Sequence, residues 1–170
     1  MRALVSGGSS GIGAATCLRL AEAALARGDR PMIAVCGNRS SAGQDEVVRS
    51  IRSMGGTAIA LGGDLGDPEV PARLVAAAVD EFGGLDVLVA NAGVAKPGAL
   101  KDLSLEDWDR MFAVNLRAAW LLAKAGYPHL RESRGAACFI SSMSGQLPHA
   151  GSGAYSPSKA ALTLLAQTLA

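Results

Sequence analysis

The sequence has few aromatic residues and few cysteines, no block of like charge, and no apolar run long enough to cross a bilayer. Its 170 residues include two Trp, two Tyr and three Phe, and the formal net charge is +1. Without a basic block, the sequence does not predict binding to nucleic acid or to an anionic membrane. No signal peptide precedes the first predicted strand, and no apolar run approaches the roughly 18 residues of a membrane span. We therefore expect a soluble, cytoplasmic protein.

The three cysteines, Cys17, Cys36 and Cys138, are widely separated and odd in number. Their spacing is not that of a metal site, so we predict no bound metal. Each cysteine lies in a stretch whose apolar neighbours indicate the protein core. We therefore expect three buried, reduced thiols.

The sequence is rich in glycine and aliphatic residues: 21 residues are Gly and 49% are hydrophobic, whereas 18% are charged. Buried strands of parallel sheets read as continuous apolar runs of this kind. Apolar runs at 3–5, 31–36, 57–61, 85–90 and 136–140 alternate with helical patterns at 14–26, 44–53, 68–82 and 104–127, and from 155 onward. This alternation predicts one α/β domain over 1–170, a Rossmann-type doubly wound parallel sheet with helices on both faces in three layers.

A glycine-rich stretch joins the first predicted strand to the first predicted helix. Gly7, Gly11 and Gly13 let the backbone turn tightly and approach a pyrophosphate, and the following helix presents free N–H groups to it. Their spacing is Gly-x-x-x-Gly-x-Gly rather than the commoner Gly-x-Gly-x-x-Gly. A flexible turn is the alternative, but the position between strand and helix favours cofactor binding. The candidate cofactor-binding residues here are Gly7, Ser9, Ser10, Gly11, Ile12 and Gly13.

The loop after the second predicted strand meets the adenosine ribose in this architecture. An acidic residue there would accept a hydrogen bond from the ribose 2′-hydroxyl, whereas an arginine would pair with a 2′-phosphate. No acidic residue occurs between Cys36 and Gln44, where the sequence instead has Asn38, Arg39 and Ser40. A solvated surface arginine is the alternative interpretation. The pattern favours NADP(H), with NAD(H) as the alternative cofactor.

Two further strand ends carry candidate cofactor contacts. Asp64 and Leu65 follow the third predicted strand, at the carboxyl edge where ligands of open α/β sheets bind. The Asp64 carboxylate would either accept a hydrogen bond from the adenine amino group or serve as a turn residue, and the sequence does not decide between the two. Asn91, Ala92 and Gly93 follow the fourth predicted strand. Small residues suit a backbone that passes close to a ligand, and Asn91 would brace the turn.

Tyr155 and Lys159 stand four residues apart at the start of the last predicted helix, so their side chains share one helix face. A positive charge beside a phenol favours the ionised form, which makes Tyr155 a candidate proton donor and acceptor near neutral pH. Tyr-x-x-x-Lys also occurs by chance in helices, so the catalytic interpretation of this pair depends on the motifs upstream. Asn115 is a polar residue in the long predicted helix that a capping box at Ser104–Asp107 opens. Judged from composition alone, Asn115 is expected to be a buried amide whose hydrogen bonds are satisfied.

Six short motifs thus stand in order along the chain. They are Ser6–Gly13, Gly63–Leu65, Asn91–Gly93, Val114–Leu116, Ile140–Ser142 and Tyr155-x-x-x-Lys159. On these motifs, essentially the whole chain resembles the classical short-chain dehydrogenases/reductases, most closely the subgroup that includes 3-oxoacyl-carrier-protein reductases.

The resemblance implies a catalytic tetrad of Asn115, Ser142, Tyr155 and Lys159. Tyr155 would protonate the carbonyl oxygen, Lys159 would lower the Tyr155 pKa and hold the nicotinamide ribose, and Ser142 would bind the substrate oxygen. Asn115 would kink its helix and hold a water that links Lys159 to solvent, which reverses its interpretation from composition. Hydride would pass between C4 of the nicotinamide and a carbonyl or secondary alcohol, such as a 3-oxoacyl group, without a metal. Tyr155 and Lys159 would therefore also bind the cofactor.

The resemblance also implies a homodimer or homotetramer, in which the helices that begin at Ser104 and Tyr155 pack against partner copies. One departure from the family is large. Its members continue beyond the equivalent of Ala170 with another strand, a substrate lid, and a final helix and strand. We therefore expect an incomplete domain whose C-terminal strands are missing and whose sheet exposes an edge.

Two other functions are consistent with parts of the sequence. A truncated dinucleotide-binding or dimerisation module would bind the cofactor without turning over a substrate. An extended-family sugar-nucleotide epimerase is disfavoured, because its glycine loop normally reads Gly-x-x-Gly-x-x-Gly and an acidic residue more often follows its second strand.

Overall fold

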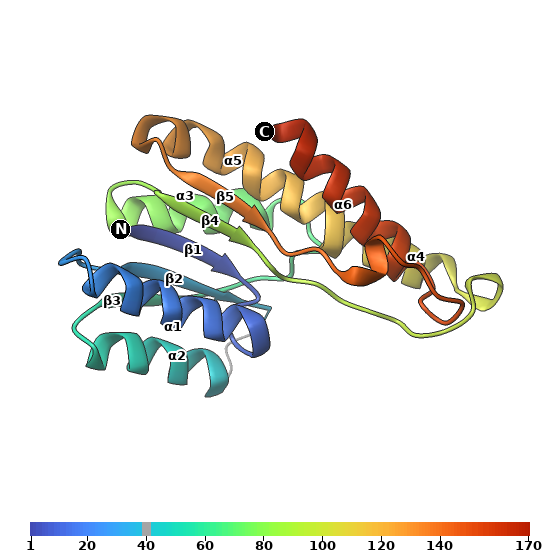
Figure 1. Ribbon diagram of the computed structural model, residues 1–170, viewed down its shortest axis with the longest axis horizontal. Helices are drawn as coiled ribbons and strands as arrows, with labels where there is room; N and C mark the ends of the chain where they lie inside the picture. Colours follow the sequence, from blue (N-terminus) through green and yellow to red (C-terminus); the bar gives the residue numbers. More distant parts are fainter. Residues whose placement is uncertain (39–41) are drawn as a thin grey trace.

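In the computed structural model, which describes residues 1–38 and 42–170, five parallel strands form one sheet in the order β3-β2-β1-β4-β5 (Figure 1). The strands are β1 (Arg2–Ser6), β2 (Met32–Gly37), β3 (Thr57–Gly62), β4 (Val87–Ala90) and β5 (Ala136–Phe139). The helices are α1 (Gly11–Leu25), α2 (Ala42–Ser53), α3 (Val70–Phe82), α4 (Leu105–Phe112), α5 (Ala118–Ser133) and α6 (Tyr155–Leu169). Within the described ranges, no helix is both long and apolar enough to cross a membrane.

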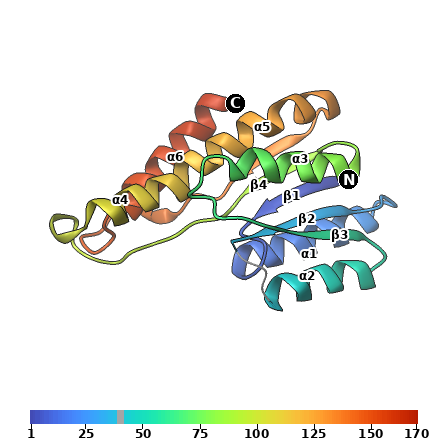
Figure 2. The same cartoon turned by 180° about the vertical axis from the view of Figure 1, so that it is seen from behind.

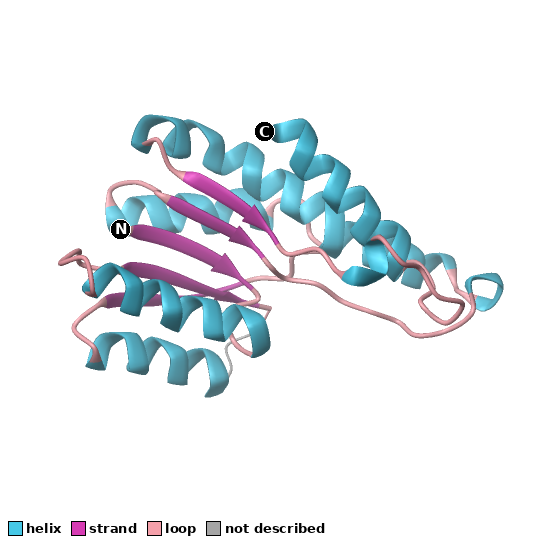
Figure 3. Cartoon of the chain, in the orientation of Figure 1, coloured by secondary structure: helices cyan, strands magenta, loops and turns pink. Residues whose placement is uncertain are grey.

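Helices cover both faces of the sheet, which confirms the predicted Rossmann-type doubly wound fold (Figure 3). Ala3 and Val5 of β1 pack with residues of α1 and α2, whereas Leu4 between them packs with residues of α3 and α5. The view from behind in Figure 2 shows α3 and α5 together on that second face. Because successive side chains of a strand point to opposite faces, a strand covered on both faces needs an apolar residue at every position. This requirement explains why the predicted strands were continuous apolar runs.

The central strand β1 pairs with β2 on one side and with β4 on the other, so that Val5 is level with Val35 and with Val89. From β1 the chain builds outward through β2 and β3, and then returns to build β4 and β5 on the opposite side. The strand order therefore reverses between β1 and β4. In open α/β sheets, ligands bind in the crevice at the carboxyl ends of the strands where this reversal occurs.

The long predicted helix begins where expected but is not regular. Ser104 caps α4: its Oγ accepts a hydrogen bond from the Asp107 backbone N–H (3.1 Å) and donates one to the Asp107 carboxylate (2.9 Å). After α4, the segment Ala113–Arg117 is π-helical, and α5 then continues through Pro128 to Ser133. A π-helical segment interrupts the i→i−4 hydrogen-bond ladder and changes the direction of the side chains that it carries.

Two of the three cysteines are buried as predicted. Cys17 on α1 and Cys36 on β2 are free thiols in the core, and burial raises the pKa of both, that of Cys17 to about 12. The prediction that Cys138 is buried is wrong, because its side chain is exposed. The reason is that β5 lies at an edge of the sheet, where the neighbouring residues Ala136 and Ala137 are exposed as well.

An ion pair fastens the start of β1 to the residue before β4. The Arg2 guanidinium lies 2.6 Å from one oxygen of the Asp86 carboxylate, and the other oxygen accepts a hydrogen bond from the Arg2 backbone N–H at 2.7 Å. Chiefly because the Arg2 side chain donates hydrogen bonds to it, the Asp86 carboxyl has a pKa below the ordinary value of about 3.9. The pair therefore helps to set the register of two central strands.

We expect Asp86→Asn to lower the free energy of unfolding by about 1–2 kcal/mol at neutral pH, because charge-assisted hydrogen bonds are replaced by weaker ones. Since the pKa of Asp86 is lower in the folded protein than in the unfolded chain, this contribution is present above the unfolded pKa of about 3.9. It is lost as the pH falls through the folded pKa. Urea unfolding of wild type and Asp86→Asn at a series of decreasing pH values measures the difference in the free energy of unfolding. Glu81→Gln, on the exposed surface of α3, serves as the control. A difference between Asp86→Asn and wild type that does not shrink with falling pH would contradict the prediction.

Candidate functional site

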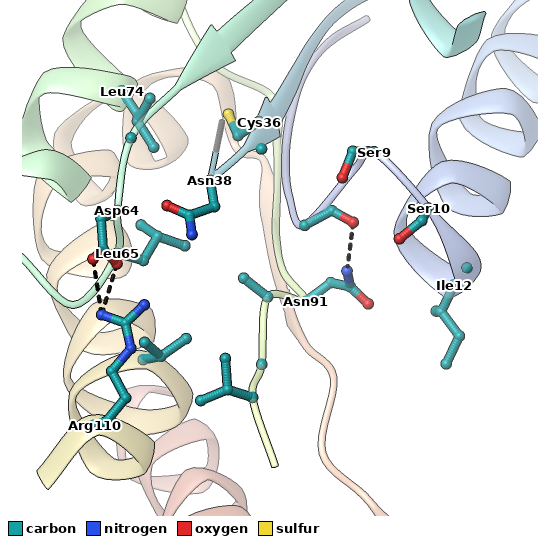
Figure 4. Close-up of a pocket in the computed structure, with 18 residues that line it drawn as sticks. Ser9, Ser10, Ile12, Cys36, Asn38, Asp64, Leu65, Leu74, Asn91 and Arg110 are labelled. Atoms are coloured by element: carbon teal, nitrogen blue, oxygen red, sulfur yellow. Dashed lines mark hydrogen bonds and ion pairs between the residues drawn. The ribbon is translucent and has the colours of Figure 1, made fainter. Parts of the chain in front are cut away.

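A cleft of about 420 Å³ opens at the carboxyl ends of the strands, at the reversal between β1 and β4 (Figure 4). Its volume lies within the range of small-molecule and cofactor sites. The predicted cofactor-binding residues that line it are Gly7, Ser9, Ser10, Gly11, Ile12, Asn38, Asp64, Leu65, Asn91, Ala92 and Gly93. Gly13 lies just behind the lining, and the candidates Arg39 and Ser40 lie outside the described residues. The structure therefore brings together candidates from four separate loops.

The glycine loop needs glycine for two different reasons. Gly7 and Gly11 adopt left-handed backbone conformations, with φ values of +66° and +52°, which residues with a side chain rarely adopt. Gly13 is in the first turn of α1, and a Cβ there would overlap the carbonyl oxygen of Gly7. Helix α1 begins at Gly11, so its first N–H groups and the positive end of its dipole are at the rim of the cleft. The loop fits the pyrophosphate of a dinucleotide, because its backbone leaves room for a close approach.

Asn91 joins the loops that follow β1 and β4. Its Nδ2 donates hydrogen bonds to the backbone carbonyls of Ser6 (2.9 Å) and Gly7 (3.2 Å), which is the bracing role that the sequence predicted. The buried Ser6 hydroxyl completes the link, since it accepts from the backbone N–H groups of Asn91 (3.0 Å) and Ala92 (3.1 Å). Sequence reasoning missed Ser6 as a positioning residue. Its place at the end of β1, just before the glycines, was the available signal.

Lys159 is buried one helical turn after Tyr155, which is the first residue of α6. Its Nζ donates a hydrogen bond to the backbone carbonyl of Ile140 (2.7 Å) and lies 5.9 Å from the centre of the Tyr155 ring. Burial lowers the pKa of Lys159, because the protein interior solvates an ammonium group less well than water does. The predicted arrangement, with both side chains on one face at the start of a helix, is therefore present.

Ser142 follows β5 and heads the short 3-10 turn Met143–Gly145. Its Oγ accepts a hydrogen bond from the Ser144 backbone N–H at 3.2 Å. The turn packs closely against α6: a Cβ atom added at Gly145 would lie only 2.9 Å from backbone atoms of Lys159 and Ala160. The neighbouring Ser141 donates to the Lys159 carbonyl at 2.9 Å and thereby holds the same helix turn against the end of β5.

Asn115 lies in the π-helical segment and is buried. Its Oδ1 accepts from the backbone N–H of Val94 (2.8 Å), and its Nδ2 donates to the Val94 carbonyl (2.9 Å) and to the Ser158 hydroxyl (3.0 Å). It is thus a satisfied buried amide, as composition alone suggested, in a helix that departs from α geometry. A Cβ at Gly93 would lie 3.3 Å from Asn115 Oδ1 and 3.5 Å from Lys159 Nζ. Asn115 and Lys159 therefore meet at the backbone that follows β4.

Asp64 serves the turn after β3 and also lines the cleft. Its Oδ1 accepts from the Gly66 backbone N–H (2.9 Å), as expected for a turn residue, and its carboxylate forms an ion pair with Arg110 of α4 (2.8 Å). Figure 4 shows the pair at the wall of the cleft. Arg110 was missed by sequence reasoning, because no local pattern indicates a contact between residues so far apart in the chain.

Comparisons with known proteins agree with this fold. A family model described as short chain dehydrogenase matches residues 1–170. Versicolorin reductase 1 of Aspergillus parasiticus is 42% identical over 130 residues, which are 76% of this chain and 47% of that protein. The 2,5-dichloro-2,5-cyclohexadiene-1,4-diol dehydrogenase LinX of Sphingobium indicum is 38% identical over 169 residues, which are 99% of this chain and 65% of that protein. This chain thus spans about half to two thirds of the length of these relatives.

Solved structures show the same likeness. The crystal structure of a short chain dehydrogenase from Burkholderia cenocepacia in complex with NADP has a TM-score of 0.90 and 40% identity, covering 99% of this chain and 66% of that one. The NADH-dependent reductase A1-R' complexed with NAD has a TM-score of 0.89 and 28% identity, covering 98% of this chain and 70% of that one. The matching model, the identities and the shared fold lead to one conclusion: the chain belongs to the short chain dehydrogenase family.

Proposed function

We propose that this chain is the cofactor-binding and catalytic part of an NADP(H)-dependent oxidoreductase that interconverts a ketone and a secondary alcohol. The observation that carries the proposal is that the cofactor-binding candidates and the buried Lys159 lie next to each other at the carboxyl edge of the sheet. The glycine loop and Asn91 line a cleft of about 420 Å³, and Lys159 lies next to Gly93, which also lines that cleft. When bound, a nicotinamide supplies or accepts hydride at its C4 carbon. The residues of the chain must then bind the cofactor, orient the substrate and transfer a proton.

Tyr155 is the proposed proton donor to the substrate oxygen in reduction, and the proton acceptor in oxidation. The Lys159 ammonium beside it is held by Ile140 through one of its three N–H donors, which leaves donors for ribose hydroxyls. Ser142 would stabilise the negative charge that develops on the substrate oxygen. Asn115 acts as a positioning residue, because it ties the backbone at Val94 to Ser158 between Tyr155 and Lys159. Its predicted water link to Lys159 remains part of this proposal.

The proposed preference for NADP(H) rests on the loop after β2. Asn38 lines the cleft there, and the sequence places Arg39, rather than an acidic residue, directly after it. An arginine at this position favours a 2′-phosphate, and an acidic residue would repel it. The related structures include one with NADP and one with NAD, so the family fold accommodates either cofactor.

The proposed substrate is a 3-oxoacyl group or a similar ketone, with the corresponding secondary alcohol in the reverse direction. The relatives named above are a reductase and a diol dehydrogenase, which suits carbonyl and alcohol chemistry. We also propose a homodimer or homotetramer. An apolar groove between α4, α5 and α6 supports this, because exposed Trp120 and Leu164 line it together with Phe112 and Leu116.

The proposal is tested by titrating purified residues 1–170 with NADPH and with NADH while following nicotinamide fluorescence. A diketone and an acetoacetyl thioester are then added to the cofactor complex. Saturable binding that prefers NADPH, followed by loss of the reduced cofactor, supports a working reductase. Binding without oxidation favours the alternative, a dinucleotide-binding module without turnover. Absence of binding to either cofactor refutes the proposed site.

We expect Tyr155→Phe to lower kcat/KM by roughly 10²–10⁴-fold, because the phenol that donates the proton is removed. The dissociation constant for NADPH should change by less than about twofold, since the ring and its contact with Lys159 remain. The matched control is Tyr127→Phe, which alters the other tyrosine, exposed on α5. Equal turnover by wild type and Tyr155→Phe would refute the catalytic role.

We expect Arg39→Asp to weaken NADPH binding by roughly 10–100-fold and to change NADH binding little, because a charge-assisted bond to the 2′-phosphate is replaced by repulsion. Fluorescence titration gives both dissociation constants. Arg49→Glu makes the same change of charge at an exposed position of α2 and serves as the control. An unchanged ratio of the NADPH and NADH constants in Arg39→Asp would rule out phosphate pairing.

A further inference from the structure

The loop that follows β3 is fastened to α4 by an ion pair that joins residues 46 positions apart. The Arg110 guanidinium contacts both oxygens of the Asp64 carboxylate, with Nη1 at 2.8 Å from Oδ1 and 2.9 Å from Oδ2. The Gly66 backbone N–H also donates to Oδ1, at 2.9 Å. The orientation of the Asp64 carboxylate is therefore set from two sides, by its own turn and by a helix from the other half of the sheet.

A second arginine from the same stretch of helix reaches the same loop at a different atom. Arg117, in the π-helical segment, donates from its Nη2 to the backbone carbonyl of Gly66. It thus holds the loop backbone, whereas Arg110 holds a side chain that lines the cleft. Arg117 therefore supports the loop backbone, and Arg110 sets the orientation of the carboxylate.

The pair lies in the part of the cleft where an adenine belongs if the proposed function is correct. Arg110, Asp64 and Leu65 line the cleft together with Asn38 at the end of β2 (Figure 4). The glycine loop, where the pyrophosphate belongs, follows β1, which is the strand next to β2 in the sheet. Adenine presents a 6-amino donor, and an ionised carboxylate is a pure acceptor that accepts several hydrogen bonds at once. A carboxylate held at this wall therefore matches a 6-aminopurine.

We propose that Arg110 is a positioning residue for base recognition: it orients the Asp64 carboxylate toward the adenine 6-amino group and makes the cleft select 6-aminopurine over 6-oxopurine dinucleotides. The inference rests on the proposed cofactor function. A 6-oxo group places an acceptor against an acceptor, so a site built to receive a donor rejects it. Arg110 also balances the negative charge of Asp64, which would otherwise stand uncompensated at the wall of a cleft that takes an anionic cofactor. Loss of Arg110 therefore weakens both the orientation and the charge balance.

The test compares NADPH with its reduced hypoxanthine analogue, which differs from it in the 6-oxo group of the base. Dissociation constants come from nicotinamide fluorescence, a binding readout that requires no turnover. We expect wild type to bind NADPH roughly tenfold more tightly than the analogue. In Arg110→Met this ratio should fall close to one, chiefly because NADPH binding weakens. Arg110→Lys, which keeps the positive charge, should retain most of the preference.

Arg117→Met is the matched control, because it removes the other arginine that holds the loop without touching the carboxylate. A role in loop support alone would move both dissociation constants together and leave their ratio unchanged, whichever arginine is replaced. The inference is overturned by a wild-type ratio near one, by a ratio that survives in Arg110→Met, or by an equal loss of the ratio in Arg117→Met. Thermal unfolding checks that the variants fold. Arg110→Gln replaces Arg110→Met if the methionine variant is unstable, and the same collapse of the ratio is expected.

Failure of this inference is distinguishable from failure of the proposed function. If wild type binds neither dinucleotide, the cleft is not a nicotinamide dinucleotide site and both proposals fall. If wild type binds NADPH and Arg110→Met keeps the tenfold preference, the cofactor site stands and only the role of Arg110 is refuted.

Discussion

The hydrogen bonds between Ser6 and Asn91 are the constraint on which the rest of the site depends. They join the loops after β1 and β4, the two central strands between which the strand order reverses. The reversal sends successive loops to opposite faces and leaves a crevice, but it does not fix the distance between the loops. A hydroxyl that accepts two N–H groups and an amide that donates to two carbonyls do fix that distance. The glycine loop is therefore held in position by the side chains of Ser6 and Asn91.

Lys159 shows how the fold accommodates a group that burial disfavours. Its ammonium loses hydration, which lowers its pKa, and it gains the Ile140 carbonyl as a hydrogen-bond partner. The surrounding contacts keep it there: Ser141 holds the helix turn at the Lys159 carbonyl, and Asn115 bonds Ser158 next to it. A buried lysine with a lowered pKa that lies beside a tyrosine is a candidate functional group, and the function proposed above uses its charge.

The fold was predictable because its signals are local. Each strand covered on both faces is an apolar run, each helix has a 3.6-residue period, and glycines mark the boundaries. The glycine loop, Asn91 and the Tyr155–Lys159 pair are local motifs as well. What could not be read from the sequence depends on distant neighbours. Cys138 has the same apolar surroundings in sequence as Cys36, but its strand lies at an edge of the sheet. Likewise, the pairing of Arg110 with Asp64 follows from packing, not from pattern.

The same helix that closes the cleft also lines the apolar groove on the opposite side. Arg110 belongs to the lining of both, whereas Leu116 and Trp120 line the groove and not the cleft. The π-helical segment between α4 and α5 contributes to both sides, since Val114 and Asn115 are buried while Leu116 and Arg117 line the groove. A partner that fills the groove would therefore contact Arg110, the residue that pairs with Asp64. Because close-packed helices transmit displacement, the proposed partner surface and the wall proposed to receive the adenine share one structural element.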